Sequence, residues 1–333
     1  MKYRDFSEYL RMRFPLFKVQ KISVDGGFTC PNRDGSKGRG GCIYCNNSSF
    51  VPRYAIASSL RPSQSIANQL NDGIRFFSYK YPEMKYIAYF QAYSGTYAPL
   101  GTLRKLYEEA LETEGVVGLI IGTRPDCVPD ETLDYLQELS ERTFVMLEYG
   151  IESTSNETLR LINRCHTYAE AEDAVRRTAA RGIPVGAHVI LGLPGESREM
   201  MMSHADRLNE LPLTSVKLHQ LQILRGTALG EAYLRHCRGR SDSGKMIDGN
   251  FLDCFTSFAM TGSGAAMTGR GVEMTVDEYI ALVREFVARL RGDIYIDRFV
   301  SQSPKELVLA PSWGLKNHEF RDKLQKNNYI CIF

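Results

Sequence analysis

The sequence predicts an α/β protein whose core is a partial (β/α)6 barrel, similar to an incomplete TIM barrel, followed by a C-terminal α+β extension. First, six short apolar segments alternate with helical segments between residues 18 and 224. Second, segments such as GVVGLIIG are apolar without interruption, which is typical of parallel strands covered by helices. Third, polar or glycine-rich clusters follow the strands, so we expect them to gather at one edge of the sheet.

The individual elements follow from the spacing of the apolar residues. We predict strands at residues 18–24, 86–90, 115–122, 143–147, 185–191 and 216–224. We predict helices at residues 1–16, 62–77, 100–113, 130–141, 156–162, 168–181 and 200–209. Beyond about residue 226 the alternation stops, although helices at 228–236 and 276–290 and a strand at 294–300 are still predicted. We therefore divide the chain into a barrel of residues 1–225 and an extension of residues 226–333 packed on it.

Composition limits the class of protein. The 333 residues, 43% of them hydrophobic, are enough for one large core with an appendage. A net charge of +2 does not by itself demand a nucleic-acid partner. The charged start of the chain is unlike a secretory signal, and no run of about eighteen apolar residues predicts a membrane span. We expect a cytoplasmic protein with reduced thiols and no membrane partner.

The most distinctive stretch is residues 30–46, CPNRDGSKGRGGCIYCN, which follows the first predicted strand. Its four glycines and its basic residues are too many for a helix or a central strand, so we predict a loop. This cysteine loop holds Cys30, Cys42 and Cys45, with eleven residues between the first two. Three thiols on one loop indicate a site for a soft metal.

Two kinds of metal site fit three cysteines. A structural zinc site needs four ligands, commonly from two pairs, and only one Cys-x-x-Cys pair is present. A fourth ligand from elsewhere stays open, because five more cysteines and six histidines occur in the chain, although buried apolar packing is the simpler explanation for those cysteines. An iron–sulfur cube held by three cysteines instead leaves one iron open to a small molecule.

The pattern Cys-x-Tyr-Cys, preceded by another cysteine after the first strand of a partial barrel, resembles the radical S-adenosylmethionine (SAM) enzymes. Their usual spacing between the first two cysteines is three residues, and the eleven here depart from it. The loop is similar to that of a narrower subgroup, the bacterial YhcC/YtqA (MnmL)-type proteins related to the catalytic subunit of Elongator. The resemblance extends over essentially the whole chain, including GLPGE and APSWGLKN.

This resemblance implies a [4Fe-4S] cluster bound by Cys30, Cys42 and Cys45, with SAM on its open iron. It also implies residues that bind SAM, namely Tyr44, Gly95, Thr96, Glu148, Glu152, Arg164, Ile190 and Gly192. Tyr44 matches the aromatic beside the adenine, Glu152 the group that binds the ribose, and Arg164 the guanidinium that holds the carboxylate. A tight turn, a salt bridge and a surface arginine are the structural alternatives for Gly95, Glu152 and Arg164.

The resemblance further implies a reaction on the tRNA wobble uridine, in which the carboxymethyl group of 5-carboxymethylaminomethyl-(2-thio)uridine is removed to give 5-aminomethyl-(2-thio)uridine. Its substrate would be tRNA and its electron donor a flavodoxin or ferredoxin. Strand ends and inward positions predict catalytic roles for Arg124, Lys217 and His219. A small metabolite or a protein as substrate stays an alternative, as does a zinc-stabilised nucleic-acid-binding module.

Basic residues are concentrated early in the chain. They form either a track for RNA phosphates near the cluster or a solvated rim. They are Arg11, Arg13, Lys18, Lys21, Arg33, Lys37, Arg39, Arg53 and Arg61.

Overall fold

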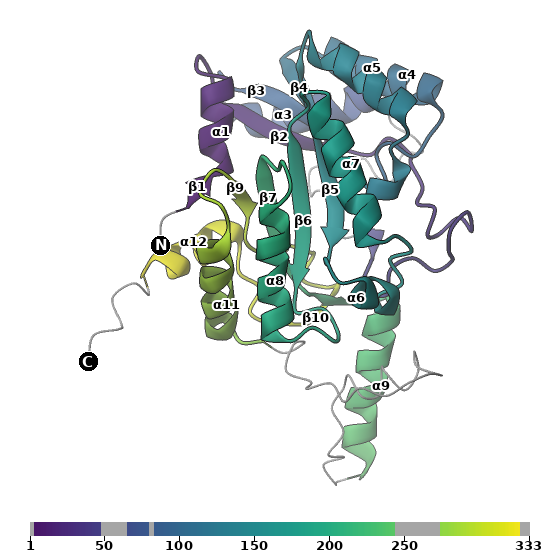
Figure 1. Ribbon diagram of the computed structural model, residues 1–333, viewed down its shortest axis with the longest axis vertical. Coiled ribbons are helices and arrows are strands. Elements are labelled where there is room, and N and C mark those ends of the chain that lie inside the picture. Colours follow the sequence, from purple (N-terminus) through teal and green to yellow (C-terminus); the bar gives the residue numbers. More distant parts are fainter. Residues whose placement is uncertain (1–2, 48–64, 80–82, 244–273, 327–333) are drawn as a thin grey trace.

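The fold is a parallel sheet that carries the cysteine loop at one edge, as seen in a computed structural model (Figure 1). The structure describes residues 3–47, 65–79, 83–243 and 274–326, and only the backbone of 237–243. The six strands predicted in the barrel region are all present. They are β2 (Val19–Val24), β3 (Lys85–Phe90), β4 (Val116–Thr123), β5 (Phe144–Glu152), β6 (Val185–Leu191) and β7 (Ser215–Gln220).

The sheet has eight strands where the sequence predicted six, in the order β1-β9-β7-β6-β5-β4-β3-β2. The predicted extension supplies β9 (Tyr295–Arg298), which pairs in parallel with β7. The chain start supplies β1 (Arg4–Asp5), which pairs in parallel with β9, in a segment predicted as helix. The strand predicted at residues 216–224 is also split, because β8 (Ile223–Leu224) leaves the sheet and pairs antiparallel with β10 (Val308–Ala310).

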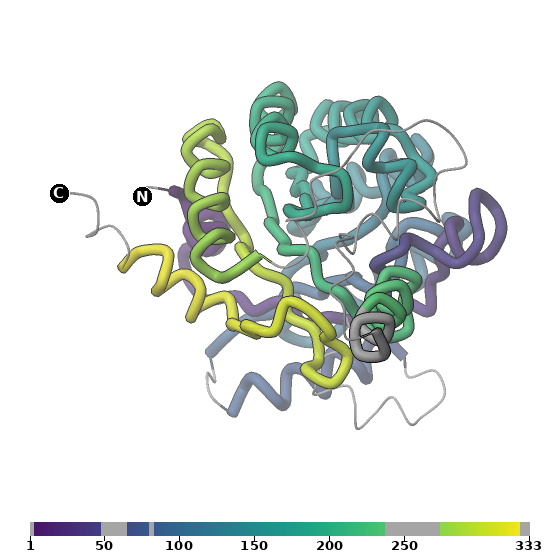
Figure 2. The backbone as a smooth tube through the Cα atoms, turned by 90° about the horizontal axis from the view of Figure 1, so that it is seen from below, coloured from purple at the N-terminus to yellow at the C-terminus, as the bar shows by residue number. Residues whose placement is uncertain are grey.

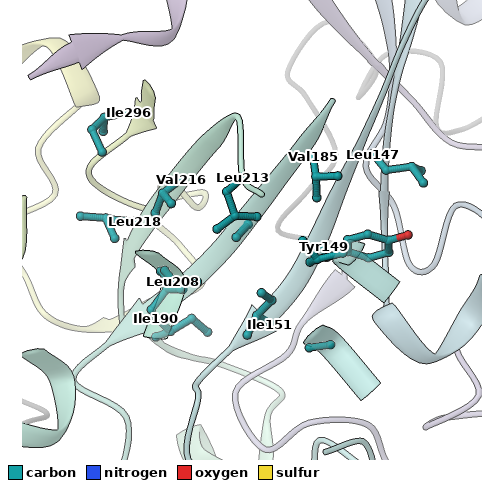
Figure 3. Close-up of a cluster of buried hydrophobic side chains, with 14 of the residues drawn as sticks. Leu147, Tyr149, Ile151, Val185, Ile190, Leu208, Leu213, Val216, Leu218 and Ile296 are labelled. Carbon is teal, nitrogen blue, oxygen red and sulfur yellow. The ribbon is translucent and has the colours of Figure 1, made fainter. Parts of the chain in front are cut away.

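Helices cover the outer face of the sheet and bury the main hydrophobic core against it. Figure 3 shows the part of this core between α8 and strands β5 to β7, with Leu208, Leu213 and Val216 labelled. The helices after the cysteine loop are α3 (Ile66–Ser78), α4 (Leu100–Glu112), α5 (Asp130–Ser140), α6 (Asn156–Leu161), α7 (Tyr168–Ala180), α8 (Arg198–Asn209), α9 (Ala228–Ser243), α11 (Val276–Arg289) and α12 (Asn317–Lys326). No helix among the described residues is long and apolar enough to cross a membrane.

The sheet curls, so that strands far apart in its order meet across an inner face (Figure 2). The Lys21 ammonium of β2 lies 2.8 Å from the Asp297 carboxylate of β9, although five strands separate them in the sheet. Helix α1 (Phe6–Arg13) covers the amino end of this face, where Phe6 belongs to an apolar cluster that includes Ile87, Phe144 and Tyr295. The open end of the half-barrel is therefore the carboxyl end, where the cysteine loop lies.

Candidate active site

The cysteine loop is held in place by hydrogen bonds from several side chains. Arg33 donates to the Cys45 carbonyl at 2.6 Å, so the eleven-residue insertion folds back on the second and third cysteines. The buried Asn32 amide donates to the Asn163 carbonyl and lies 3.6 Å from the Cys42 sulfur. The Asn163 side chain donates back to a loop carbonyl at 2.8 Å. The insertion is thereby fastened to the segment that follows α6.

Two glycines are needed where this loop closes on itself. A Cβ on Gly38 would lie 2.3 Å from the Asn32 side-chain oxygen. Gly41 has a φ of +79° and a Cβ there would lie 2.8 Å from the Arg33 guanidinium. Glycine tolerates both the close approach and the left-handed backbone. The glycine-rich composition of the insertion therefore reflects its compact fold.

Arg164 follows α6 and directs a buried positive charge at the thiols. It donates to the Gly150 carbonyl at 2.7 Å and to the Cys42 sulfur at 3.6 Å, and it lies 3.4 Å from a Glu152 oxygen. Its Nε donates to His166 Nε2 at 3.0 Å. Burial, and then the charge of Arg164, lowers the pKa of His166 to about 3, so this imidazole is neutral and can accept.

The turn after β3 carries the predicted SAM residues Gly95 and Thr96. The Gly95 amide donates to the Gly122 carbonyl at 2.9 Å, and its own carbonyl accepts the Tyr107 hydroxyl at 2.6 Å. Thr96 donates to a backbone carbonyl of the next turn at 2.5 Å. The Ser94 hydroxyl is buried and has no partner among the described residues. Ser94 is thus the group on this turn that stays available to a ligand.

Tyr44, Ile190 and Gly192 are the residues predicted on the adenine side. Ile190 lies near the end of β6, and Gly192 follows with a φ of +91°. Tyr44 lies on the cysteine loop near Glu152 and Cys42. Burial, and then these two acidic neighbours, raises the pKa of Tyr44 well above its usual range, so the phenol is neutral.

Arg124 follows β4 and is tied to the cysteine loop through Asp126. Its Nε and Nη2 each donate to the Asp126 carboxylate at 2.9 Å, and Lys37 of the loop donates to the same group at 2.7 Å. Although burial opposes it, these cations hold the pKa of Asp126 at about 2. The remaining Arg124 nitrogen, Nη1, is buried without a partner among the described residues. Arg124 therefore keeps one donor for a ligand.

A second set of charges lies lower on the inner face, and we call Lys21, Tyr89, Glu148, Lys217 and Asp297 the charged layer. The Lys217 ammonium lies 2.7 Å from Glu148, 3.1 Å from the Tyr89 hydroxyl and 3.2 Å from Asp297. Lys21 lies 3.3 Å from Glu148 and 2.8 Å from Asp297. Against the effect of burial, the two lysines hold the pKa of Glu148 well below its usual range and that of Asp297 at about 2. Two ammonium groups thus face two carboxylates.

This layer contains two residues to which the sequence assigned other roles. Glu148 was expected in a loop after the strand, but β5 continues to Glu152, so Glu148 points inward from the middle of the strand. Lys217 was expected to face substrate, and all three of its protons have acceptors within the layer. Cofactor binding by Glu148 and catalysis by Lys217 stay predictions.

The basic residues of the early chain do not share one face. Arg11 and Arg13 belong to α1, which covers the amino end of the sheet, and Lys21 lies in the charged layer. The predicted RNA track near the cluster is therefore wrong for these three, because two are at the far end and one is paired inside. Arg53 and Arg61 lie outside the described residues.

The cysteine loop suits a cluster better than a single ion. No three His, Cys, Asp or Glu side chains of the described chain converge tightly enough to hold one metal ion. A zinc ion needs its ligands at one point, whereas a cube takes each thiolate on a different iron. Arg33 and Arg164 beside Cys45 and Cys42 suit the negative charge of a thiolate-bound cluster. Ser94 Oγ and Arg124 Nη1 are donors left over for a bound ligand.

The structure brings together most of the predicted site. The three cysteines and Tyr44 lie on the cysteine loop itself. Arg164 contacts the loop at Cys42 and lies beside Glu152, and Arg124 is joined to the loop by Asp126. His219 lies lower, on the inner face of β7. The sequence reasoning missed residues that orient these groups, namely Asn32, Asp126, Asn163, His166 and Asp297. His166 had a usable signal, because it lies two residues after Arg164.

Comparison with known proteins agrees with this geometry. Residues 32–208 match the model of the radical SAM superfamily, and residues 267–329 match the radical SAM C-terminal domain. YtqA of Bacillus subtilis is 32% identical over 327 residues, which cover 98% of this chain and 89% of YtqA. A tRNA uridine(34) acetyltransferase of Methanocaldococcus infernus is 28% identical over 126 residues, which cover 36% of this chain and 22% of that protein.

A solved structure shows the same fold. The Elp3 of Methanocaldococcus infernus, with an N-terminal deletion, superposes with a TM-score of 0.60 at 15% identity. The match covers 93% of this chain, and this chain spans only 62% of that one. The family match includes Cys42 and Cys45 and the strand ends that surround them. The chain therefore belongs to the radical SAM superfamily, the enzymes that use a [4Fe-4S] cluster and S-adenosylmethionine.

Proposed function

We propose that this radical SAM enzyme acts on the tRNA wobble uridine and removes the carboxymethyl group of 5-carboxymethylaminomethyl-(2-thio)uridine, leaving the 5-aminomethyl form. The observation that carries this proposal is the sequence similarity to a relative named for uridine 34 of tRNA. A tRNA substrate places the reaction in the cytoplasm, with a flavodoxin or ferredoxin as electron donor.

The net reaction balances with water as a co-substrate. SAM and the secondary amine give methionine, 5′-deoxyadenosine, the primary amine, glyoxylate and one proton. The methylene carbon of the carboxymethyl group, which is bonded to the nitrogen, is oxidised by two electrons, and SAM is reduced by two. Water supplies the aldehyde oxygen as the carbon–nitrogen bond breaks. When bound, the cluster and SAM supply a carbon radical that removes a hydrogen atom from that methylene.

Residues of the chain would hold and orient the reactants. Cys30, Cys42 and Cys45 would bind the cluster, and Arg164 would hold the SAM carboxylate in the manner of a guanidinium fork. Arg124 suits the carboxylate of the substrate better than Lys217, because Arg124 Nη1 is unpartnered among the described residues and Lys217 is fully engaged.

The insertion between Cys30 and Cys42 carries three cations, and the contacts of Arg33 and Lys37 with the site leave Arg39 for the tRNA backbone. Arg33 and Lys37 bind Cys45 and Asp126, so removing them disturbs the loop itself. Arg39 is exposed, and we assign phosphate contact to it. An Arg39→Ala variant should weaken tRNA binding and keep its iron, while Lys37→Ala should also loosen the loop.

Mass spectrometry of tRNA nucleosides from cells with and without the gene tests the function. The 5-carboxymethylaminomethyl nucleoside should accumulate without the gene, and the reconstituted enzyme should release glyoxylate from such tRNA. Identical nucleosides in both strains, with 5′-deoxyadenosine formed only when a metabolite or protein extract is added, would reject tRNA and favour the alternative substrate class.

A further inference from the structure

Two histidines lie above the charged layer on the inner face. The rings of His188 on β6 and His219 on β7 have centroids 5.5 Å apart, with planes inclined at 51°. The His188 side chain is 17% exposed and His219 is half-buried, whereas the Glu148 side chain beneath them is 1% exposed. In the sheet, His188 is paired with Gly150, whose carbonyl is held by Arg164. The imidazoles thus lie between the charged layer and the cysteine loop.

Hydrogen bonding fixes which nitrogen of His188 is free. Its Nε2 lies 2.9 Å from Glu148 Oε2. Glu148 is ionised because, against the effect of burial, Lys217 and Lys21 hold its pKa well below the usual range. An ionised carboxylate can only accept, so Nε2 of His188 carries the hydrogen. In the neutral ring, Nδ1 is therefore an acceptor.

The same reasoning applies to His219. The Ser301 hydroxyl lies 2.8 Å from His219 Nδ1 and 3.3 Å from the Gln220 carbonyl. In the tautomer in which that hydroxyl donates to the carbonyl, His219 Nδ1 carries the hydrogen and donates to the hydroxyl. Burial, and then the positive charges around it, keeps the pKa of His219 well below its usual range, so the ring is neutral, and in this tautomer Nε2 accepts. His188 Nδ1 and His219 Nε2 have no hydrogen-bond partner in the described parts of the chain. Neither atom is among the fully buried atoms that lack a partner.

Two neighbouring rings, each with a nitrogen that can accept, select for a ligand that donates. A carboxylate or phosphate offers only lone pairs, and the uracil ring offers one N–H between two carbonyl acceptors. A secondary ammonium offers two N–H donors from one atom. Lys217 does not change this selection, because its three protons are directed at Glu148, Asp297 and Tyr89.

We propose that His188 and His219 bind the secondary ammonium of the 5-carboxymethylaminomethyl side chain, and that His188 removes one of its protons. This inference rests on the proposed function and names the part of the substrate that the inner face recognises. An N–H bond of the ammonium breaks, its electron pair stays on the nitrogen, and the proton forms a bond to His188 Nδ1. Glu148 stabilises the resulting imidazolium and is a positioning residue.

The proton transfer matters for the neighbouring methylene. A nitrogen lone pair stabilises an unpaired electron on the adjacent carbon, and an ammonium has no lone pair to offer. The base must therefore act before the methylene reacts. The ionisable groups around His188 come from five strands: Lys21, Tyr89, Glu148, Lys217, His219 and Asp297.

A purely structural role for His188 is disfavoured by the contacts of Glu148. That carboxylate already accepts from Lys217 and Tyr89 at 2.7 Å and lies 3.3 Å from Lys21. It needs no fourth donor to stay satisfied when buried. The arrangement instead matches a histidine oriented by a carboxylate, with the opposite ring nitrogen turned to the reactant.

The test uses the reconstituted holoenzyme and tRNA carrying 5-carboxymethylaminomethyluridine. Single-turnover formation of the aminomethyl nucleoside is measured from about pH 6 to about pH 9 for wild type, His188→Gln, His219→Gln and the exposed-site control His318→Gln. His188→Gln should react about 100-fold more slowly at neutral pH, a typical loss for a general base. The deficit should shrink as pH rises, because more of the amine then arrives already deprotonated.

The remaining variants and a substrate analogue complete the test. His219→Gln should raise the KM for tRNA and keep the wild-type pH profile, and His318→Gln should match wild type. Replacing the amine nitrogen of the substrate by an ether oxygen removes both N–H donors, so wild-type enzyme should bind that tRNA about tenfold more weakly. This comparison needs no variant to fold.

The outcomes separate the two proposals. An iron-replete His188→Gln enzyme that keeps the wild-type rate, or loses the same factor at every pH, overturns the role of His188. Equal binding of the ether analogue overturns recognition of the ammonium. In either case, aminomethyl product from wild type leaves the proposed function standing. Failure of wild type to form that product rejects the proposed function and this inference together.

Discussion

The charged layer and the surroundings of the cysteine loop are both buried and charged, yet they differ in how their charges are matched. In the layer, two lysines face two carboxylates, and each proton of Lys217 has an acceptor. Around the loop, Arg33, Lys37, Arg124 and Arg164 face Asp126 and Glu152, and two donor atoms have no partner among the described residues.

This difference shows which region is complete without a ligand. A buried donor without a hydrogen-bond partner is costly in free energy. A protein that keeps such donors must recover that free energy when a ligand binds. The layer is finished by the fold itself. The loop region, with excess positive charge, is finished only by anionic partners such as thiolates, a cluster and a carboxylate.

The largest expected effect is the loss of the cluster. Cys42→Ser should abolish iron binding and formation of 5′-deoxyadenosine, because a hydroxyl does not replace a thiolate ligand. Iron per chain after anaerobic reconstitution measures this. The control is Cys127→Ser, a buried cysteine after β4 that should keep its iron. Full iron in Cys42→Ser would remove the cysteine loop from the site and end the comparison.

Breaking the layer should have the next largest effect. Glu148→Gln leaves Lys21 and Lys217 short of negative charge, so the free energy of unfolding should fall by about 3–5 kcal/mol. Urea unfolding measures it. The double variant Glu148→Met with Lys217→Met should lose less than Glu148→Gln, because both buried charges are removed together. A double variant less stable than the single one would mean that the layer is not self-contained.

Removing the fork of Arg164 should affect ligand binding more than folding. Arg164→Lys should raise the SAM dissociation constant about 10- to 100-fold, since a lysine cannot donate in parallel to a carboxylate. Equilibrium binding to the iron-loaded enzyme measures this, with the exposed Arg160→Lys as control. Unchanged SAM affinity in Arg164→Lys would assign the SAM carboxylate to another group, with Arg124 Nη1 as the next candidate.

The smallest effect, counted per histidine and per pH unit, is a dependence of stability on pH. His166 and His219 have pKa values lowered by burial, so below about pH 6.5 the unfolded chain binds protons that the folded chain does not. Stability should therefore fall with falling pH, by about 1.4 kcal/mol per pH unit for each such histidine. Unfolding curves at pH 7 and pH 5 measure the slope. His166→Gln should make it shallower, and His318→Gln should not.

The sequence predicted the cysteine loop well and the charged layer poorly, for physical reasons. Three cysteines on a glycine-rich loop form a local pattern that needs no knowledge of packing. The sequence places Glu148 just after the predicted strand of residues 143–147, whereas a charge inside a buried strand is costly unless it is paired. Its partners Lys21 and Lys217 come from β2 and β7, and Asp297 of β9 completes the layer. No local sequence pattern predicts these contacts.

The same limit explains the miscounted strands. β9 follows β7 only after the whole of the region from 221 to 294, so the strand–helix rhythm that predicted the other six gives no hint that it pairs with β7. β1 is two residues long and carries no periodic signal. Partner choice in a parallel sheet depends on long-range packing, which local spacing does not report.

β1 and β9 are neighbours in the sheet but are synthesised far apart in time. Among the strands of the sheet, β1 leaves the ribosome before the others, and its neighbour in the sheet is β9, which leaves after the others. Lys21 and Lys217 likewise emerge long before Asp297, which both of them contact. The nascent chain therefore has its inner face open, with two lysines beside the single carboxylate of Glu148, until β9 has been made. Its carboxyl-terminal segment, rather than its amino-terminal barrel, completes the interior.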